Sequence, residues 1–170
     1  PALPVRCAPG DNLAIHVAVA TAPAGHALVV DVGDVPDRGY WGEVLTTGAE
    51  ARQLAGLVID GGVRDVDALC GHGFPAFSAT VALRGATKRE RGSVGLPVEV
   101  AGTTVAPGDW VVGDVDGVVI VPGESLDDVL TAGQARAGKE AGYFEALRGG
   151  TTTVELLGLD VGGIEVREGQ

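Results

Sequence analysis

Cysteine, aromatic side chains and positive charge are all scarce in this chain of 170 residues. The two cysteines, Cys7 and Cys70, belong to no Cys-x-x-Cys pair or His/Cys cluster, which excludes a disulfide framework and a zinc site. We interpret both as small buried side chains. With 12 Lys and Arg against 23 Asp and Glu, the net charge of −11 disfavours binding to nucleic acid and to anionic lipid.

Long apolar runs are also missing. The longest stretch without a charged side chain, residues 12–30, is interrupted by His, Thr, Pro and Gly, whereas a membrane-spanning helix needs ~20 largely apolar residues. The first residues lack the pattern of a secretory signal and do not begin with Met, so we expect a cytoplasmic protein whose amino terminus is trimmed or shortened. The length predicts a single domain over residues 1–170.

Short apolar segments rich in β-branched residues predict a mixed α/β domain, with a central sheet buried on both faces and helices packed outside it. Apolar residues at helical spacing predict one helix over 43–55 and another over 125–147. The predicted strands are 3–7, 28–32, 57–59, 75–79, 98–100, 110–112 and 118–121.

The carboxyl-terminal part of the chain is the least regular. Gly133, Gly138 and Gly142 interrupt the second predicted helix, so we expect them to divide it or to pack closely against a neighbour. The tail 151–170 alternates small apolar groups with acids and glycines. We expect it to add an edge strand or to lie against a partner subunit.

The segment Tyr40-Trp41-Gly42-Glu43-Val44-Leu45 stands at the predicted start of the first helix. The first backbone N–H groups of a helix have no intrahelical partners and lie at the positive end of the helix dipole. Those donors form a binding site for a carboxylate or a phosphate, and Gly42 allows a ligand to approach the backbone closely. Taken alone, the segment is more typical of an ordinary helix start with an acidic first turn.

A second segment presents an arginine and an aspartate where a predicted strand ends. Leu57-Val58-Ile59 runs into Asp60-Gly61-Gly62, and Arg64-Asp65 follows. Loops at the carboxyl ends of buried strands are where α/β sheets bind ligands. A guanidinium can clamp a carboxylate or stabilise an enolate, and a carboxylate can bind a hard divalent metal. Taken alone, this pair is more typical of a solvated turn.

The two segments form one pattern, Gly42-Glu43-x-Leu45 and then Arg64-Asp65, with twenty residues between Glu43 and Arg64. This pattern resembles the active-site signature of the class II pyruvate aldolases typified by 4-hydroxy-4-methyl-2-oxoglutarate aldolase, within the RraA-like family. The resemblance covers nearly all of the chain, apart from helices that precede the first matching segment in the family. Further similar segments are 9–12, 49–65, 73–77, 107–112 and 114–122.

The resemblance implies an RraA-like α/β fold with a β/β/α swivelling arrangement, a central buried sheet and flanking helices. It implies homotrimers or hexamers with sites at subunit interfaces. Backbone groups of Gly42, Glu43, Val44 and Leu45 are expected to hold the carboxylate of a small 2-oxo acid, and Arg64 is expected to contact the same substrate.

The resemblance also implies the chemistry. Asp65 is expected to bind Mg²⁺ or Mn²⁺, largely through water, and Arg64 to stabilise a pyruvate enolate. The implied reactions are aldol cleavage of 4-hydroxy-4-methyl-2-oxoglutarate-type acids and decarboxylation of oxaloacetate. A water or hydroxide on the metal, near Glu43, is the expected base. Lys139-Glu140 is similar to a late-helix step of the family, so Glu140 is expected to transfer protons at a neighbouring site.

Glu43 departs from the family pattern, because the aldolases generally carry Asp there. The additional methylene moves the carboxylate, and displacements of ~1 Å can change the rate about a hundredfold. Activity or substrate choice is therefore expected to differ. The alternative is a non-catalytic RraA-like regulator that binds a ribonuclease. That branch lacks an acid at the position of Glu43 and the Asp after the Arg, so Glu43 and Asp65 favour the enzyme.

The basic residues leave two further alternatives. A Schiff-base aldolase needs an active lysine, and Lys88 and Lys139 both lack an apolar, pocket-like sequence context. A basic cluster around Lys88 is interpreted as a solvated loop or as a contact for the distal carboxylate of a dianionic substrate. Its members are Arg84, Lys88, Arg89 and Arg91.

Overall fold

The computed structural model describes residues 1–165, which form two compact units, Pro1–Leu126 and a second that begins at Asp127. All of the predicted strands are present in the first unit, with bounds shifted by a few residues. The single domain predicted over 1–170 stays a prediction.

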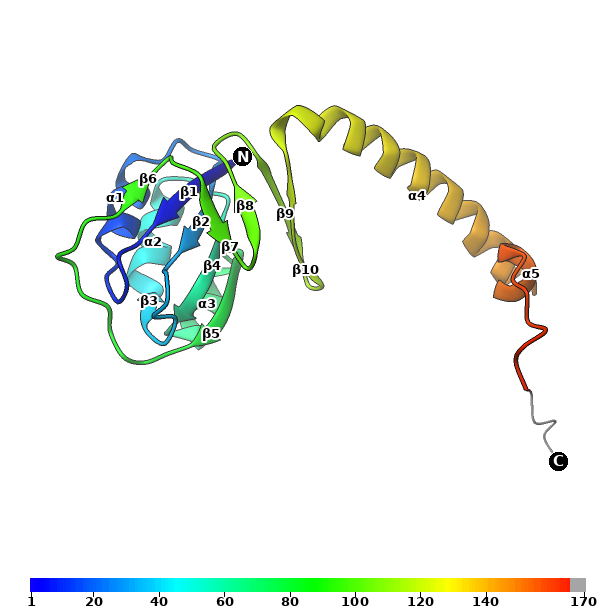
Figure 1. Cartoon of the computed structure of the whole chain (residues 1–170), viewed down its shortest axis with the longest axis horizontal. Helices are drawn as coiled ribbons and strands as arrows, with labels where there is room; N and C mark the ends of the chain where they lie inside the picture. Colours follow the sequence, from blue (N-terminus) through cyan, green and yellow to red (C-terminus); the bar gives the residue numbers. More distant parts are fainter. Residues whose placement is uncertain (166–170) are drawn as a thin grey trace. The chain divides into compact units, whose positions relative to one another are not determined.

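A six-stranded sheet forms the centre of the first unit (Figure 1). Its order is β3-β4-β2-β1-β6, and β5 also pairs with β4. All of its pairings are parallel except that of β6 with β1. The strands are β1 (Ala2–Arg6), β2 (Ala27–Asp31), β3 (Gly39–Trp41), β4 (Gly56–Val63), β5 (Ala76–Val81) and β6 (Ser93–Val94).

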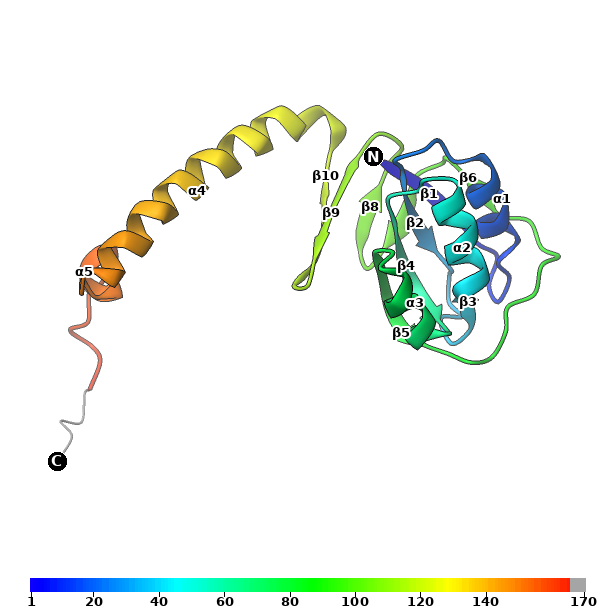
Figure 2. The same cartoon turned by 180° about the vertical axis from the view of Figure 1, so that it is seen from behind.

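Helices cover one face of this sheet and β hairpins lie on the other, as opposite views show (Figures 1 and 2). The helices are α1 (Leu13–Thr21), α2 (Glu43–Ala51) and α3 (Val66–His72). The hairpins are β7 (Val98–Val100) with β8 (Thr103–Val105), and β9 (Trp110–Asp114) with β10 (Gly117–Val121).

The side chains of β2 show how the central sheet packs against helices on one face and hairpins on the other. Successive side chains of a strand point to opposite faces. Leu28 and Val30 are fully buried in the cluster that contains Ile15 of α1, whereas Val29 between them packs with Val98 of the β7–β8 hairpin. The mixed α/β class with a buried central sheet and flanking helices is thereby confirmed.

Two local expectations in the first unit need correction. The helix predicted over 43–55 ends at Ala51, because the chain turns there and Gln53 adopts a positive φ of 58°. Cys7 is buried as predicted, but the prediction was wrong for Cys70, which is exposed. Cys70 lies on α3, a short helix in which Leu69 is the buried residue.

The second unit is helical. It consists of α4 (Leu126–Arg148), which the short 3-10 helix η1 (Gly123–Ser125) precedes, and α5 (Thr153–Leu157), which starts in a capping box. The prediction that glycines divide α4 was wrong, since α4 is continuous. A Cβ at Gly133, Gly138 or Gly142 would meet nothing within 4 Å among the described atoms of this chain, and close packing against a neighbour stays a prediction.

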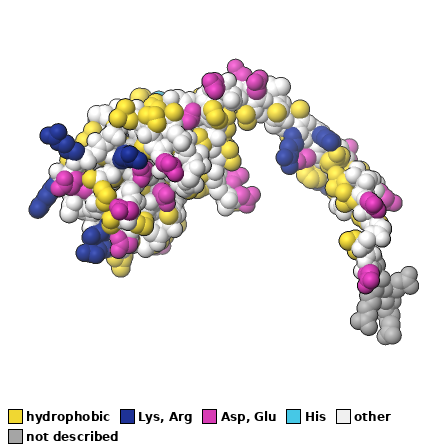
Figure 3. All heavy atoms as spheres, in the orientation of Figure 1, with side chains coloured by type: hydrophobic (Ala, Val, Ile, Leu, Met, Phe, Trp, Pro, Cys, Tyr) yellow, Lys and Arg dark blue, Asp and Glu magenta, His cyan; other side chains and the backbone are white. Residues whose placement is uncertain are grey.

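The described part of the tail that follows α4 contains no strand, and α4 itself exposes apolar side chains. No strand occurs within residues 151–165, so the predicted edge strand was wrong there, and residues 166–170 lie outside the described part. Contact with a partner subunit stays a prediction. Apolar side chains lie at the surface of α4, among them Val129, Leu130 and Phe144 (Figure 3). No helix within residues 1–165 has the length and apolar character to span a membrane.

Candidate active site

The start of α2 and the end of β4 lie side by side because β3 pairs with the last residues of β4. Gly39 and Trp41 are in register with Gly62 and Val63. The backbone N–H of Arg64 then donates to the carbonyl oxygen of Trp41 at 2.9 Å. Since α2 begins directly after β3, this pairing brings the two segments of the sequence signature together.

Asp65 turns back toward the first residue of α2. Its backbone is left-handed, with φ 57° and ψ 37°, a conformation that is uncommon outside glycine and often found at functional sites. Its Oδ2 accepts a hydrogen bond from the backbone N–H of Glu43 at 3.2 Å and lies 3.7 Å from Nε of Arg64. The carboxylate therefore lies between a helix N-terminus and a guanidinium, both of which complement its charge.

Gly42 permits this close approach. A Cβ atom at this position would overlap Oδ2 of Asp65, and it would lie 3.0 Å from Cγ and 3.2 Å from Nε of Arg64. The φ of Gly42 is −169°, an extended conformation open to any residue. Glycine is therefore needed here for space and not for backbone freedom.

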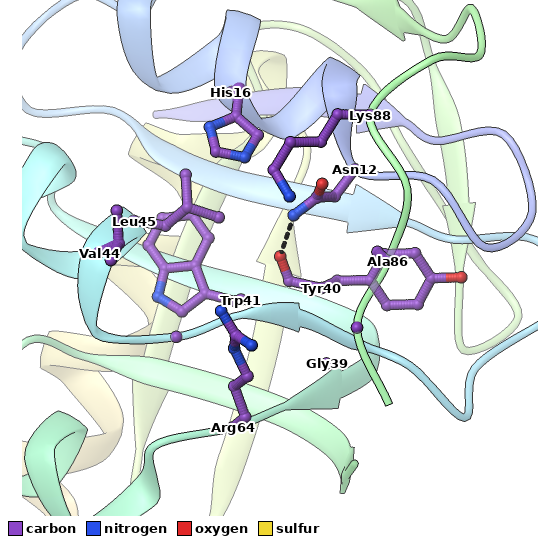
Figure 4. Close-up of a pocket in the computed structure, with 12 residues that line it drawn as sticks. Asn12, His16, Gly39, Tyr40, Trp41, Val44, Leu45, Arg64, Ala86 and Lys88 are labelled. Carbon is purple, nitrogen blue, oxygen red and sulfur yellow. Dashed lines mark hydrogen bonds between the residues drawn. The ribbon is translucent and has the colours of Figure 1, made fainter. Parts of the chain in front are cut away.

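A cavity of about 190 Å³ opens beside these residues (Figure 4). Arg64 points into it from one side, and Lys88 and His16 approach from the other. The cavity is smaller than the pockets of roughly 300–1,000 Å³ that hold drug-sized ligands, so it suits a small, negatively charged metabolite. Its lining residues are Asn12, His16, Gly39, Tyr40, Trp41, Gly42, Val44, Leu45, Arg64, Gly85, Ala86 and Lys88.

Most of the predicted substrate-binding residues meet at this cavity. Gly42, Val44, Leu45 and Arg64 all line it. Lys88 lines it as well, although its sequence context did not indicate a pocket. The roles assigned to these residues stay predictions, but the segments that carry them come together as the signature requires.

Glu43 and Glu140 are placed differently. Glu43 does not line the cavity, and its Oε1 lies 3.8 Å from Nε2 of His72 on α3. Nδ1 of that histidine in turn lies 2.8 Å from Oε2 of Glu50. Glu140 belongs to the second unit, where its carboxylate accepts a hydrogen bond of 2.7 Å from Nε of Arg136, one helical turn away. The catalytic roles predicted for both glutamates stay predictions.

Sequence reasoning did not identify Asn12 and His16 as site residues. Nδ2 of Asn12 donates to the carbonyl oxygen of Tyr40 at 2.7 Å. Oδ1 of Asn12 and Nε2 of His16 are buried, and neither has a hydrogen-bond partner within residues 1–165. Both residues stand in a largely apolar segment of the sequence, where a polar side chain can indicate a site residue. Two buried polar atoms without protein partners at one cavity indicate a polar ligand.

Asp11 fixes the loop that brings Lys88 to the cavity. Its Oδ2 accepts hydrogen bonds from Oγ1 of Thr87 at 2.7 Å and from the backbone N–H of Arg89 at 2.6 Å, and its Oδ1 accepts one from Leu13 at 2.8 Å. Burial by itself raises the pKa of Asp11, but these hydrogen bonds outweigh burial and lower the pKa to about 2.

Asp65 is the residue best suited to a divalent cation. Within the described chain, no three His, Cys, Asp or Glu side chains are grouped so that they would hold a metal. Mg²⁺ is commonly bound through one or two carboxylates, with waters and substrate oxygens in the remaining positions. The side chain of Asp65 is 40% exposed, which leaves space for waters of this donor set, whereas the positive charge of the adjacent Arg64 opposes a cation.

Fold and site together define a mixed α/β protein with a small cavity, lined by Arg64 and Lys88, where a parallel strand ends and a helix begins. The chain belongs to the RraA-like family, because a sequence model of that family, described as Aldolase/RraA, matches residues 1–120. The resemblance that the sequence signature predicted is thereby confirmed.

Three similar proteins illustrate the family. The chain is 34% identical over 130 residues to a protein of Halalkalibacterium halodurans named "Putative 4-hydroxy-4-methyl-2-oxoglutarate aldolase", and the match covers 76% of this chain but 62% of that relative. An uncharacterized protein from Pseudomonas syringae superposes with a TM-score of 0.81 at 31% identity, over 89% of this chain and 70% of that one. The RNA-processing inhibitor RraA from Thermus gives a TM-score of 0.66 at 27% identity, over 71% and 73%.

Proposed function

We propose that the chain is a metal-dependent lyase that cleaves 4-hydroxy-4-methyl-2-oxoglutarate-type 2-oxo acids to pyruvate and also decarboxylates oxaloacetate. The observation that carries this proposal is that Arg64 and the first turn of α2 line one small cavity, while Asp65, which is not part of the lining, lies beside both of them. The name of the Halalkalibacterium relative supports the same reaction class.

Some residues at the cavity bind the substrate, and Arg64 stabilises the charge that develops during the reaction. The unpaired N–H groups in the first turn of α2, at Val44 and Leu45, bind the substrate carboxylate. The guanidinium of Arg64 enters the cavity near this carboxylate and stabilises the negative charge that grows on the keto oxygen as the C–C bond breaks. Both proposed reactions leave the same pyruvate enolate, so one site serves both.

Asp65 is the proposed holder of the divalent cation. When bound, Mg²⁺ or Mn²⁺ supplies positive charge that polarises the 2-oxo acid. The hydrogen bond from Glu43 N–H and the neighbouring Arg64 orient the Asp65 carboxylate for this task. The backbone N–H of Glu43 orients Asp65, whereas the side-chain carboxylate of Glu43 lies near His72.

The test is a panel of 2-oxo acids, oxaloacetate included, assayed for pyruvate with Mg²⁺, with Mn²⁺ and with EDTA. We expect pyruvate release that EDTA abolishes and that Arg64→Ala lowers by about 10²–10³-fold, the usual effect of removing one charge-stabilising donor. Borohydride trapping with pyruvate tests Lys88 as a Schiff-base lysine. Absence of pyruvate from every acid at both metals would contradict the proposal.

A regulator that binds a ribonuclease is the second candidate, favoured by the structural similarity to the RNA-processing inhibitor RraA. It predicts a protein partner and no turnover. Unchanged decay of oxaloacetate in the presence of the wild-type chain, of Arg64→Ala and of EDTA would support it.

The proposal includes a homotrimer or hexamer in the cytoplasm, with Glu140 of one subunit transferring protons at the site of the next. Exposed apolar side chains on α4, such as Leu130 and Phe144, support contact with another subunit. Light scattering coupled to gel filtration measures the assembly. Glu140→Gln is expected to lower activity without changing the mass.

A further inference from the structure

His16 lines the cavity and carries a buried ring nitrogen that no other role explains. The residue lies on α1 and lines the cavity wall on the side opposite Arg64 (Figure 4). Its Nε2 is buried and has no hydrogen-bond partner in the described part of the chain. A buried polar atom at a ligand cavity calls for a functional explanation, since unpaired buried groups are costly.

The other polar groups of the cavity are poorly suited to accept a proton. Arg64 and Lys88 are cations. The hydroxyl of Tyr40 donates to the carbonyl oxygen of Val35 and accepts a hydrogen bond from the N–H of Gly10. The Asn12 side chain is an amide and has no basic nitrogen. Among the described residues that line the cavity, His16 is therefore the one with a basic nitrogen available.

The surroundings of His16 keep its ring neutral. Burial lowers the pKa of His16 below its ordinary value, and the positive charge of Lys88 lowers it further, while Asp11 opposes the shift. Arg64 faces it across the cavity, and Arg52, directly after the end of α2, lines a second hollow together with His16. A neutral imidazole is the form that removes a proton from substrate.

We propose that His16 is the general base for aldol cleavage, an inference that rests on the proposed lyase function. The imidazole of His16 takes the proton of the 4-hydroxyl, the C4–O bond becomes a carbonyl, and the C3–C4 bond breaks with its electron pair moving into the enolate. The imidazolium then returns the proton to C3, which becomes the methyl group of pyruvate. Decarboxylation of oxaloacetate has no hydroxyl proton to remove, so its bond cleavage needs no base.

This difference defines the experiment. His16→Gln is assayed with Mg²⁺ on 4-hydroxy-4-methyl-2-oxoglutarate and on oxaloacetate, beside His26→Gln as a control histidine that does not line the cavity. We expect the His16 variant to lose about 10²–10⁴-fold in kcat for cleavage, the usual contribution of a general base, and to lose far less in kcat for decarboxylation of oxaloacetate. The control is expected to keep both activities.

A titration provides a second readout that does not depend on turnover. Proton NMR of the histidine rings is expected to show His16 titrating below the ordinary value of about 6.5. Lys88→Gln removes a neighbouring charge, so it should raise the pKa of His16 and move the acidic limb of kcat/KM for cleavage to higher pH.

Four outcomes would overturn the inference. Equal losses of cleavage and decarboxylation in His16→Gln would assign it a structural role, and unchanged cleavage would exclude it as the base. A wild-type chain that decarboxylates oxaloacetate but cleaves no 4-hydroxy acid would refute the inference while leaving the decarboxylase part of the proposed function. If neither reaction occurs, both the inference and the proposed function fail.

Discussion

Replacing Gly42 by alanine is the sharpest test of the candidate site. The added Cβ would overlap Oδ2 of Asp65 and lie 3.0 Å from Cγ of Arg64. Because C···O contacts settle at roughly 3.3–3.6 Å, the carboxylate has to move by about 1 Å. The extended φ of −169° accepts alanine without strain, so the disturbance falls on the two functional side chains.

The expected effect is large for activity and small for stability. A displacement of ~1 Å in a catalytic group costs about 10²-fold in rate. The atoms that must yield are side-chain atoms of Asp65 and Arg64, whose side chains are 40% and 46% exposed, so the fold can adjust around them. We therefore expect kcat/KM of Gly42→Ala to fall about a hundredfold with little change in Tm.

Pyruvate release from oxaloacetate and a thermal melt measure the two quantities on one preparation. Gly71→Ala is the matched control, because it lies on α3, which directly follows Asp65, and its Cβ would meet nothing within 4 Å among the described atoms. It should keep wild-type activity. Full activity in Gly42→Ala would show that the junction of Asp65, Arg64 and α2 is not where the reaction occurs.

Three further predictions concern Asp65, Asp11 and the cysteines. Asp65→Asn keeps a side chain that tolerates the left-handed backbone, so it should lose Mg²⁺-dependent pyruvate release without losing Tm; unchanged metal dependence in an EDTA titration would contradict this. The pKa of Asp11 is about 2 in the folded chain, against an ordinary value of 3.8. The ionised carboxylate therefore stabilises the fold by about 2 kcal/mol above about pH 4, and this stabilisation is lost as the pH falls toward 2. Urea unfolding should therefore find Asp11→Asn less stable than the wild type at pH 7, with a smaller difference near pH 2. A thiol reagent should modify Cys70 in the native chain and Cys7 only after unfolding, since Cys7 is buried and burial raises its pKa to about 12; equal rates would be the contrary result.

The elements that were predicted correctly are those with a strong local pattern. Largely apolar runs such as 28–32 and 57–59 indicated strands buried on both faces, and both faces of β2 are indeed buried. The start of α2 followed from Gly42-Glu43 before an apolar stripe. These signals depend on residues close in sequence, so a single chain is enough to read them.

Other elements depend on tertiary pairing. Strand β3, Gly39–Trp41, exists because β4 continues past the end of β2 and offers paired backbone groups at Gly62 and Val63. Helix α1 is apolar on nearly every side, with Leu13 and Val17 exposed and Ile15 buried, so it lacks the one-sided stripe that identifies a surface helix. No spacing within either segment encodes these contacts.

The candidate site likewise has one part that the sequence predicts and one part that depends on tertiary contacts. Arg64 and Asp65 were predictable because the strand end and the helix start together match a family signature, although each segment alone is more typical of an ordinary turn or helix start. The opposite wall was not, because Lys88 reaches the cavity through a loop that Asp11 holds from 76 residues away in sequence, by its hydrogen bond to Oγ1 of Thr87. That same Lys88 helps to lower the pKa of His16. The protonation state of the proposed base therefore depends first on burial and then on Lys88, whose loop is held by an aspartate that does not line the cavity. Weakening the Asp11 contacts should displace Lys88 and so alter the pH dependence of cleavage before it alters the fold of the sheet.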